Sequence, residues 1–264
     1  MIIAVIVWIS SNSSSPNLAK ETDLPGYVAL VIIETKYGDR VIPGFYATGF
    51  LVDKDKGLVA TAAHIVETWL VEAKNNTSPQ YRVFLQGRNY LAKSYENAID
   101  WKSDTAILFL ENYNPNDLPD PAKFSETVFV GQQLSVFGYA LIKTHSNGVI
   151  KSYYNITIPE EIVPTTIESR VNKTGARQED LSILSSLKIM ALQLENKSGT
   201  AIPREKLLLF FNDYILTTPT SGFSGAPLTN SEGQVVAMHS SSVGLIGLEI
   251  PSQFIISLLR YQQK

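Results

Sequence analysis

Three short segments contain residue types that together can perform nucleophilic chemistry. His64 directly follows an apolar run in TAAHIV, Asp104 directly precedes one in SDTAILFL, and Ser224 lies between glycines in SGFSGAPL. Acyl transfer requires a hydroxyl nucleophile, an imidazole that takes its proton, and a carboxylate that orients the imidazole. The three residues in this order, each beside its own predicted strand, therefore predict a catalytic triad.

The glycines beside Ser224 fit a second part of the same chemistry. Backbone N–H groups of Gly222 and Ser224 can point at one position and stabilise a developing oxyanion. A residue without Cβ lets the chain turn tightly enough to bring the two groups together. We therefore expect the amides of Gly222 and Ser224 to form an oxyanion hole.

Asp100 is an alternative to Asp104 as the carboxylate of the triad. The two residues lie four positions apart in the same acidic turn. Asp104 is preferred because it directly precedes the apolar run Thr105–Leu110.

The elements that must position these groups are mostly strands. Short runs rich in β-branched and aromatic residues, separated by turn residues, are typical of an all-β domain. The predicted strands cover residues 27–36, 45–53, 57–63, 81–87, 105–111, 133–139, 148–158, 207–216, 234–241 and 244–250. Short strands in this number fit two small barrels better than one sandwich.

Two segments are predicted as helices. In residues 178–195, apolar residues recur at helical spacing after an acidic start, which indicates an amphipathic helix. Residues 252–261 follow Pro251 and are predicted as a closing helix. No compositional break marks a second independent domain.

Composition excludes several classes of site. The 264 residues include no Cys and only three His, namely His64, His145 and His239. Disulfides, thiolate zinc sites and a Cys nucleophile are therefore excluded, a multi-His metal site is improbable, and we expect neither a metal nor a cofactor. The net charge of −3 makes nucleic acid a poor candidate partner. His145 lies in a polar turn and is expected at the surface.

The N-terminus differs from the rest of the chain. Residues 1–9 are an unbroken apolar run, too short for the roughly 20 residues that span a bilayer, and a Ser/Asn-rich stretch follows. We interpret residues 1–22 as an apolar segment and tether, either a truncated signal or anchor or simply a buried or disordered end. The signal interpretation favours an extracytoplasmic or secreted location over a cytoplasmic one. Any membrane contact is expected through this segment alone, and residues 23–264 are expected to form one domain with an insertion at about 159–205.

The three motifs, followed by GQVVAMHSSS and GLEIPSQFI, resemble the chymotrypsin-fold serine proteases over about residues 26–259. The resemblance is nearest to the bacterial trypsin-like branch that includes the HtrA/Deg proteases and the glutamyl endopeptidases, without a PDZ-like segment after Lys264. It implies two perpendicular six-stranded β-barrels, with His64 and Asp104 in the first, Ser224 in the second, and a substrate cleft between them. The implied function is a serine endopeptidase that cuts protein or peptide substrates through an acyl-enzyme.

Two residues beside the nucleophile depart from the family pattern. Phe223 stands where the family usually has Asp or Asn, and Ala226 replaces the second Gly after the nucleophile. The alternative function is therefore an inactive, protease-like binding or regulatory module, in which Phe223 and the inserted helix hold the oxyanion loop shut.

The resemblance also suggests a specificity pocket. The strand after the nucleophile, residues 235–242, is expected to form one pocket wall and to pair with the substrate backbone. The residues assigned to substrate binding are Ser221, His239, Ser240 and Ser242. An imidazole and hydroxyls supply donors to a buried carboxylate, so Glu, then Gln or Asp, is expected before the scissile bond. The alternative is that His239 only packs or hydrogen-bonds within the second barrel.

Overall fold

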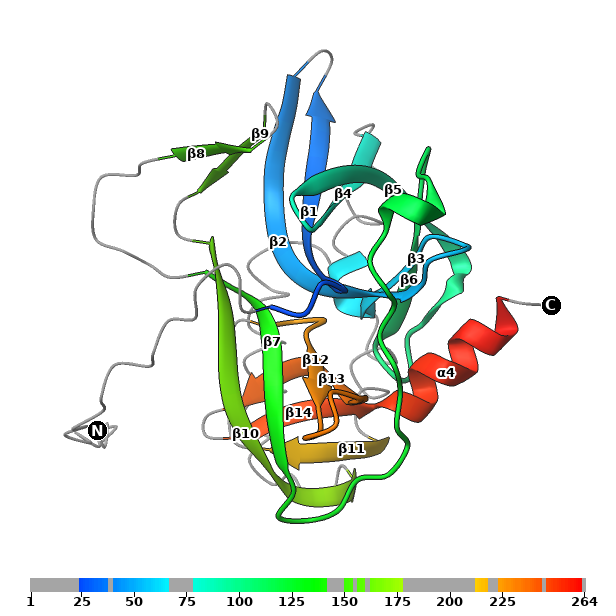
Figure 1. The fold of residues 1–264 in the computed structure, drawn as a ribbon, viewed down its shortest axis with the longest axis vertical. Helices are drawn as coiled ribbons and strands as arrows, with labels where there is room; N and C mark the ends of the chain where they lie inside the picture. Colours follow the sequence, from blue (N-terminus) through cyan, green and yellow to red (C-terminus); the bar gives the residue numbers. More distant parts are fainter. Residues whose placement is uncertain are drawn as a thin grey trace, which may run out of the picture.

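The computed structural model describes residues 24–37, 40–66, 78–141, 150–153, 156–159, 162–177, 212–217, 223–243 and 246–262. Its strands form two closed six-stranded barrels and a separate two-stranded sheet (Figure 1). The first barrel lies above the second in that view, and helix α4 runs along their right side. The expected all-β fold with two six-stranded barrels is confirmed.

The first barrel is antiparallel, with strand order β1-β2-β3-β6-β5-β4. Its strands are β1 (Val28–Tyr37), β2 (Arg40–Asp53), β3 (Leu58–Ala62), β4 (Ser78–Leu85), β5 (Arg88–Asp100) and β6 (Thr105–Leu110). Alternate residues of β1 enter two different apolar clusters: Val31 and Ile33 join one, while Leu30 and Ile32 join the other. Both faces of β1 are thus covered, which explains why its residues 28–33 are apolar without interruption.

The second barrel has strand order β10-β11-β14-β13-β12-β7. Its strands are β7 (Gln133–Leu141), β10 (Ile162–Arg177), β11 (Asn212–Thr217), β12 (Pro227–Thr229), β13 (Val235–Val243) and β14 (Ile246–Pro251). A 3-10 turn, η2 (Pro115–Asp117), lies in the connection between the barrels. The predicted closing helix is confirmed as α4 (Ser252–Tyr261), which begins directly after Pro251.

Three strands were missed by the sequence pattern, and one predicted strand is in fact two. The missed β5 has only two buried residues, so it lacks an apolar run, and the missed β12 is only three residues long. The strand predicted at 148–158 is a hairpin of β8 (Ile150–Tyr153) and β9 (Ile156–Pro159). The missed β10 falls inside the range 159–205 predicted as an insertion, yet it pairs with β7 and β11 in the second barrel.

Several predictions fall on residues outside the described part of the chain. These are the N-terminal segment 1–22, the amphipathic helix 178–195, the surface position of His145, and the site residues Ser221 and Gly222. Among the residues that the structure describes, no helix has the length and apolar character needed to cross a membrane.

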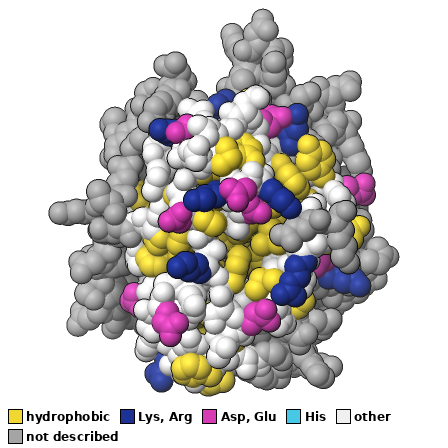
Figure 2. Space-filling view, turned by 45° about the vertical axis from the view of Figure 1, so that its right-hand side comes forward, with side chains coloured by type: hydrophobic (Ala, Val, Ile, Leu, Met, Phe, Trp, Pro, Cys, Tyr) yellow, Lys and Arg dark blue, Asp and Glu magenta, His cyan; other side chains and the backbone are white. Residues whose placement is uncertain are grey.

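Charged side chains are intermixed on the face of the molecule seen in Figure 2. Basic and acidic groups alternate across it, with apolar side chains between them. On the described part of this face, neither sign of charge forms a continuous patch of the kind that a polyanion would need.

Candidate active site

His64 lies directly after β3, where a helical segment starts at Ala63. The pairing of β3 with β6 sets Ala62 opposite Thr105. The residues that follow Ala62 therefore lie beside the residues that precede Thr105. The amide of Ala63 donates to the carbonyl of Asp104 at 2.9 Å. The His64 side chain is about one-third exposed, at 33%. The neighbouring strands therefore deliver the imidazole and the carboxylate to one place.

Asp104 is fully buried and takes hydrogen bonds from two elements. The backbone amide of His64 donates to Oδ1 at 2.8 Å, and the imidazole Nδ1 lies 2.9 Å from Oδ2. Asp104 has a φ of 52°, a left-handed conformation that Asp adopts more readily than most residues. With the imidazole proton on Nδ1, the carboxylate fixes both the tautomer and the orientation of the ring.

Asp100 has a different, local structural role. Its carboxylate accepts from the hydroxyl of Ser103 at 2.7 Å and from the amide of Lys102 at 3.0 Å. These are local bonds that shape the turn before β6. The structure therefore brings Asp104, and not Asp100, to His64.

Ser240 connects Asp104 to Ser224. Its hydroxyl donates to Oδ2 of Asp104 at 2.5 Å, and its carbonyl accepts from the hydroxyl of Ser224 at 3.2 Å. Sequence reasoning assigned Ser240 to substrate binding and missed this contact with the carboxylate. Hydrogen bonds through Ser240 on β13 thus join Asp104 to Ser224. His64 is joined to them through Asp104.

Thr48 on β2 holds the Ser224 loop against the first barrel, and sequence reasoning missed it. Its amide donates to the carbonyl of Ser224 at 3.0 Å, and its carbonyl accepts from the hydroxyl of Thr61 at 2.8 Å. A Cβ at Gly225 would lie 2.0 Å from that same carbonyl oxygen, and Gly225 has a φ of 84°. Only glycine fits both this close approach and this backbone conformation.

The two residues that depart from the family pattern, Phe223 and Ala226, are accommodated by apolar packing. Phe223 and Ala226 are buried in the core cluster of the second barrel, beside Val136 and Leu228. Gly138 makes room for the Phe223 ring, since a Cβ there would lie 2.4 Å from it. Gly222, the other residue of the expected oxyanion hole, is outside the described residues.

His239 has a buried partner that the sequence did not suggest. Its Nδ1 lies 3.0 Å from Oε2 of Glu249 on the neighbouring strand β14. Both side chains are buried, His239 with 1% exposure and Glu249 with 0%. The side chain of Ser242, the other pocket residue predicted on β13, is outside the described set.

A model of the trypsin-like peptidase domain matches residues 47–238, which contain His64, Asp104 and Ser224. The chain belongs to the trypsin-like peptidase family. Family and fold together make it a serine-type peptidase, a hydrolase whose substrates are proteins or peptides.

A solved structure has the fold of this trypsin-like peptidase. The active form of the Rv3671c protease from M. tuberculosis is 18% identical, with a TM-score of 0.56. The match covers 89% of this chain and 80% of that one. At this identity the likeness concerns the fold alone. A search of curated protein sequences found no match.

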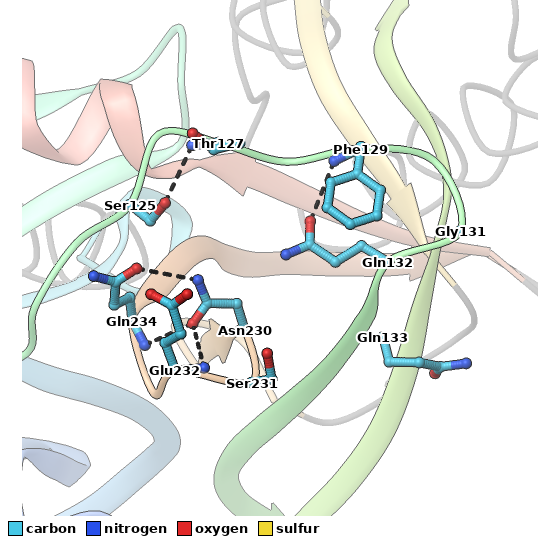
Figure 3. Close-up of a pocket in the computed structure, with 10 residues that line it drawn as sticks. All are labelled: Ser125, Thr127, Phe129, Gly131, Gln132, Gln133, Asn230, Ser231, Glu232 and Gln234. Carbon is cyan, nitrogen blue, oxygen red and sulfur yellow. Dashed lines mark hydrogen bonds between the residues drawn. The ribbon is translucent and has the colours of Figure 1, made fainter.

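A separate hollow of about 550 Å³ lies on the second barrel of the trypsin-like peptidase (Figure 3). It is lined by Ser125, Thr127, Phe129, Gly131, Gln132, Gln133, Asn230, Ser231, Glu232 and Gln234. Several of its polar groups bond to one another: Asn230 accepts from the amides of Glu232 and Gln234, and Gln132 accepts from the amide of Phe129. This lining stabilises its own turns and contains none of the predicted site residues. Within the described residues, His, Asp and Glu do not gather in a group that could hold a metal.

Proposed function

We propose that this trypsin-like peptidase is a serine endopeptidase that cuts through an acyl-enzyme, with His64 as base, Asp104 as its orienting carboxylate and Ser224 as nucleophile. The observation that carries the proposal is the position of Asp104. It holds the imidazole of His64 by Nδ1 at 2.9 Å and is linked through Ser240 to the hydroxyl of Ser224.

Each group then has a defined step. With its proton on Nδ1 directed at Asp104, the imidazole of His64 has the lone pair of Nε2 available to accept the Ser224 proton. The Ser224 oxygen attacks the scissile carbonyl, and the amides of Gly222 and Ser224 stabilise the resulting oxyanion. His64 then gives the proton to the leaving amine, and a water molecule hydrolyses the acyl-enzyme by the same route.

Ser240 supports this arrangement from behind the carboxylate. The hydroxyl bond to Asp104 and the two bonds from His64 satisfy a carboxylate that is fully buried. A buried carboxylate without such partners would be costly. The Ser224 hydroxyl donates to the Ser240 carbonyl at 3.2 Å, so it must turn towards His64 before it gives up its proton.

We place the enzyme nearest to the HtrA/Deg and glutamyl endopeptidase branch and propose Glu as the preferred residue before the scissile bond. His239, Ser221 and Ser242 are the proposed donors to that side chain. In support of this pocket, the strand that carries His239 adjoins the nucleophile loop: the amide of His239 donates to the carbonyl of Ala226, and its carbonyl accepts from the amide of Gly225. His239 is thereby fixed against the loop that carries Ser224.

A fluorophosphonate probe tests the proposal, since it reacts only with an activated serine. The wild-type chain should be labelled, and Ser224→Ala should not. Asp104→Asn should lower kcat by about 10⁴-fold because the imidazole takes the wrong tautomer. Asp100→Asn is the matched control and should retain nearly full activity.

Failure of wild-type labelling under conditions where the chain is folded would overturn the proposed activity. It would favour the non-cutting binding module instead. Equal losses in Asp100→Asn and Asp104→Asn would contradict the role assigned to Asp104.

A further inference from the structure

Two titratable side chains form a buried pair directly behind the nucleophile loop. Both carboxylate oxygens of Glu249 lie near Nδ1 of His239, at 3.0 and 3.2 Å. The two residues are opposite one another in the β13–β14 register. Neither catalysis nor the barrel fold in itself requires ionisable groups at these positions.

Burial restricts the protonation states that the His239–Glu249 pair can adopt. A carboxylate with 0% exposure is strongly destabilising unless a partner compensates its charge. The pair can consist of an imidazolium and a carboxylate, of a neutral imidazole whose Nδ1–H donates to the carboxylate, or of a neutral imidazole that accepts a hydrogen bond from a carboxylic acid. His239 carries a positive charge only in the first case.

The pair is also rigidly connected to the reactive centre. The amide of Gly225 donates to the carbonyl of His239, and the amide of His239 donates to the carbonyl of Ala226, each at 2.8 Å. The next residue along β13 is Ser240, which bonds Asp104. A charge on His239 is therefore held at a fixed place beside the nucleophile loop.

We propose that Glu249 is a positioning residue for substrate selection: its carboxylate keeps His239 protonated, so that an acidic side chain before the scissile bond meets a positive charge. This inference rests on the proposed function, because it takes His239 as part of the specificity pocket. The nearer imidazolium attracts a substrate carboxylate more strongly than Glu249, on the other side of the ring, repels it. Glu249 thus sets the preference for an acid over its amide.

Glu249→Gln is the direct test, because glutamine keeps an acceptor for the Nδ1 proton and removes the charge. The measurement is kcat/KM for two peptides that differ only in Glu or Gln before the scissile bond. We expect the Glu-to-Gln ratio to fall about tenfold, the difference between a hydrogen bond to a charged donor and one to a neutral donor. Fluorophosphonate labelling of Glu249→Gln shows whether its active site is still assembled, and Glu249→Asp should restore most of the ratio.

Glu232→Gln is the matched control. It removes an exposed carboxylate from a turn of the same barrel, and it should leave the ratio unchanged. An unchanged ratio in Glu249→Gln would overturn the proposal. A wild-type enzyme that is labelled by the probe but cuts after small aliphatic residues would overturn it as well, while leaving the triad intact.

A second measurement does not require Glu249→Gln to fold. Nitrogen NMR of the wild-type chain, labelled at histidine, reports the protons on each ring, and substitution of His64 and His145 identifies the His239 signals. We expect both ring nitrogens of His239 to carry a proton at neutral pH. An unprotonated Nδ1 would show that Glu249 is the proton donor, and an unprotonated Nε2 would show a neutral imidazole that donates to the carboxylate. Either result would overturn the proposal.

Discussion

Gly225 and Gly233 share a positive φ but differ in what surrounds them. Their φ angles are 84° and 73°. A Cβ at Gly225 would collide with the carbonyl oxygen of Thr48, whereas nothing lies within 4 Å of one at Gly233. The comparison separates backbone strain from the close contact between the nucleophile loop and the first barrel.

Gly225→Ala should therefore destabilise the protein more than Gly233→Ala does. Strain alone costs about 1 to 3 kcal/mol, and the overpacked contact at Gly225 adds a similar amount. Urea denaturation gives the free energy of unfolding for both variants. Because the Gly225 contact holds Ser224, only Gly225→Ala should also slow fluorophosphonate labelling. Equal destabilisation of the two variants would contradict the contact.

At the scale of elements, a buried ion pair connects β1 to β4. Glu34, with 1% exposure, accepts from Nε of Arg82 at 2.9 Å and from the side-chain Nε2 of Gln80 at 2.8 Å. Burial and, to a smaller extent, the Glu34 charge raise the pKa of the nearby Tyr46. The Glu34–Arg82 ion pair therefore links β1 to β4, the two strands whose pairing closes the first barrel.

Glu34→Ala should cost about 3 kcal/mol of stability, because Arg82 is then left mostly buried without its partner. Lys54 and Asp120 provide the control, since this pair has a similar distance of 3.1 Å but side chains 40% and 93% exposed. Solvent screens such a pair, so Asp120→Asn should scarcely move the urea midpoint. Similar midpoints for the two variants would show that burial does not control the strength of the β1–β4 pair.

At the scale of the whole molecule, the two barrels and α4 share one core. A single apolar cluster contains Phe50 from the first barrel, Met238 and Ile250 from the second, and Ile255 from the helix. The bond from Thr48 to the Ser224 carbonyl also crosses between barrels. Neither barrel can lose its structure without exposing part of the other's core.

Phe50→Ala should consequently destabilise both barrels, by about 3 to 5 kcal/mol. Calorimetry should give one unfolding transition for the wild type and the variant. Hydrogen exchange should report an equal loss of protection in β6 and β13, which belong to different barrels. Two transitions, with only the first moved by the substitution, would mean that the barrels unfold independently.

The sequence alone was sufficient for the features that are encoded locally. The apolar runs beside His64 and Asp104 identified β3 and β6, and Pro251 marked the start of α4. Period and composition reveal such elements because each one buries its own apolar residues. β5 was not predicted because only two of its residues are buried, and β10 was not predicted because polar residues interrupt its apolar ones.

Only the tertiary structure decided which polar groups meet. Ser240 reaches Asp104 across 136 positions of the sequence, and Thr48 reaches the loop of Ser224. Glu249 faces His239 because of the register between β13 and β14. Register and barrel closure determine which side chains oppose each other, and a shift of one residue would turn each to the other face of its strand. Long-range hydrogen bonds of this kind leave no periodic signal in the chain, which is why the partners of the proposed catalytic and specificity residues appeared only in the folded protein.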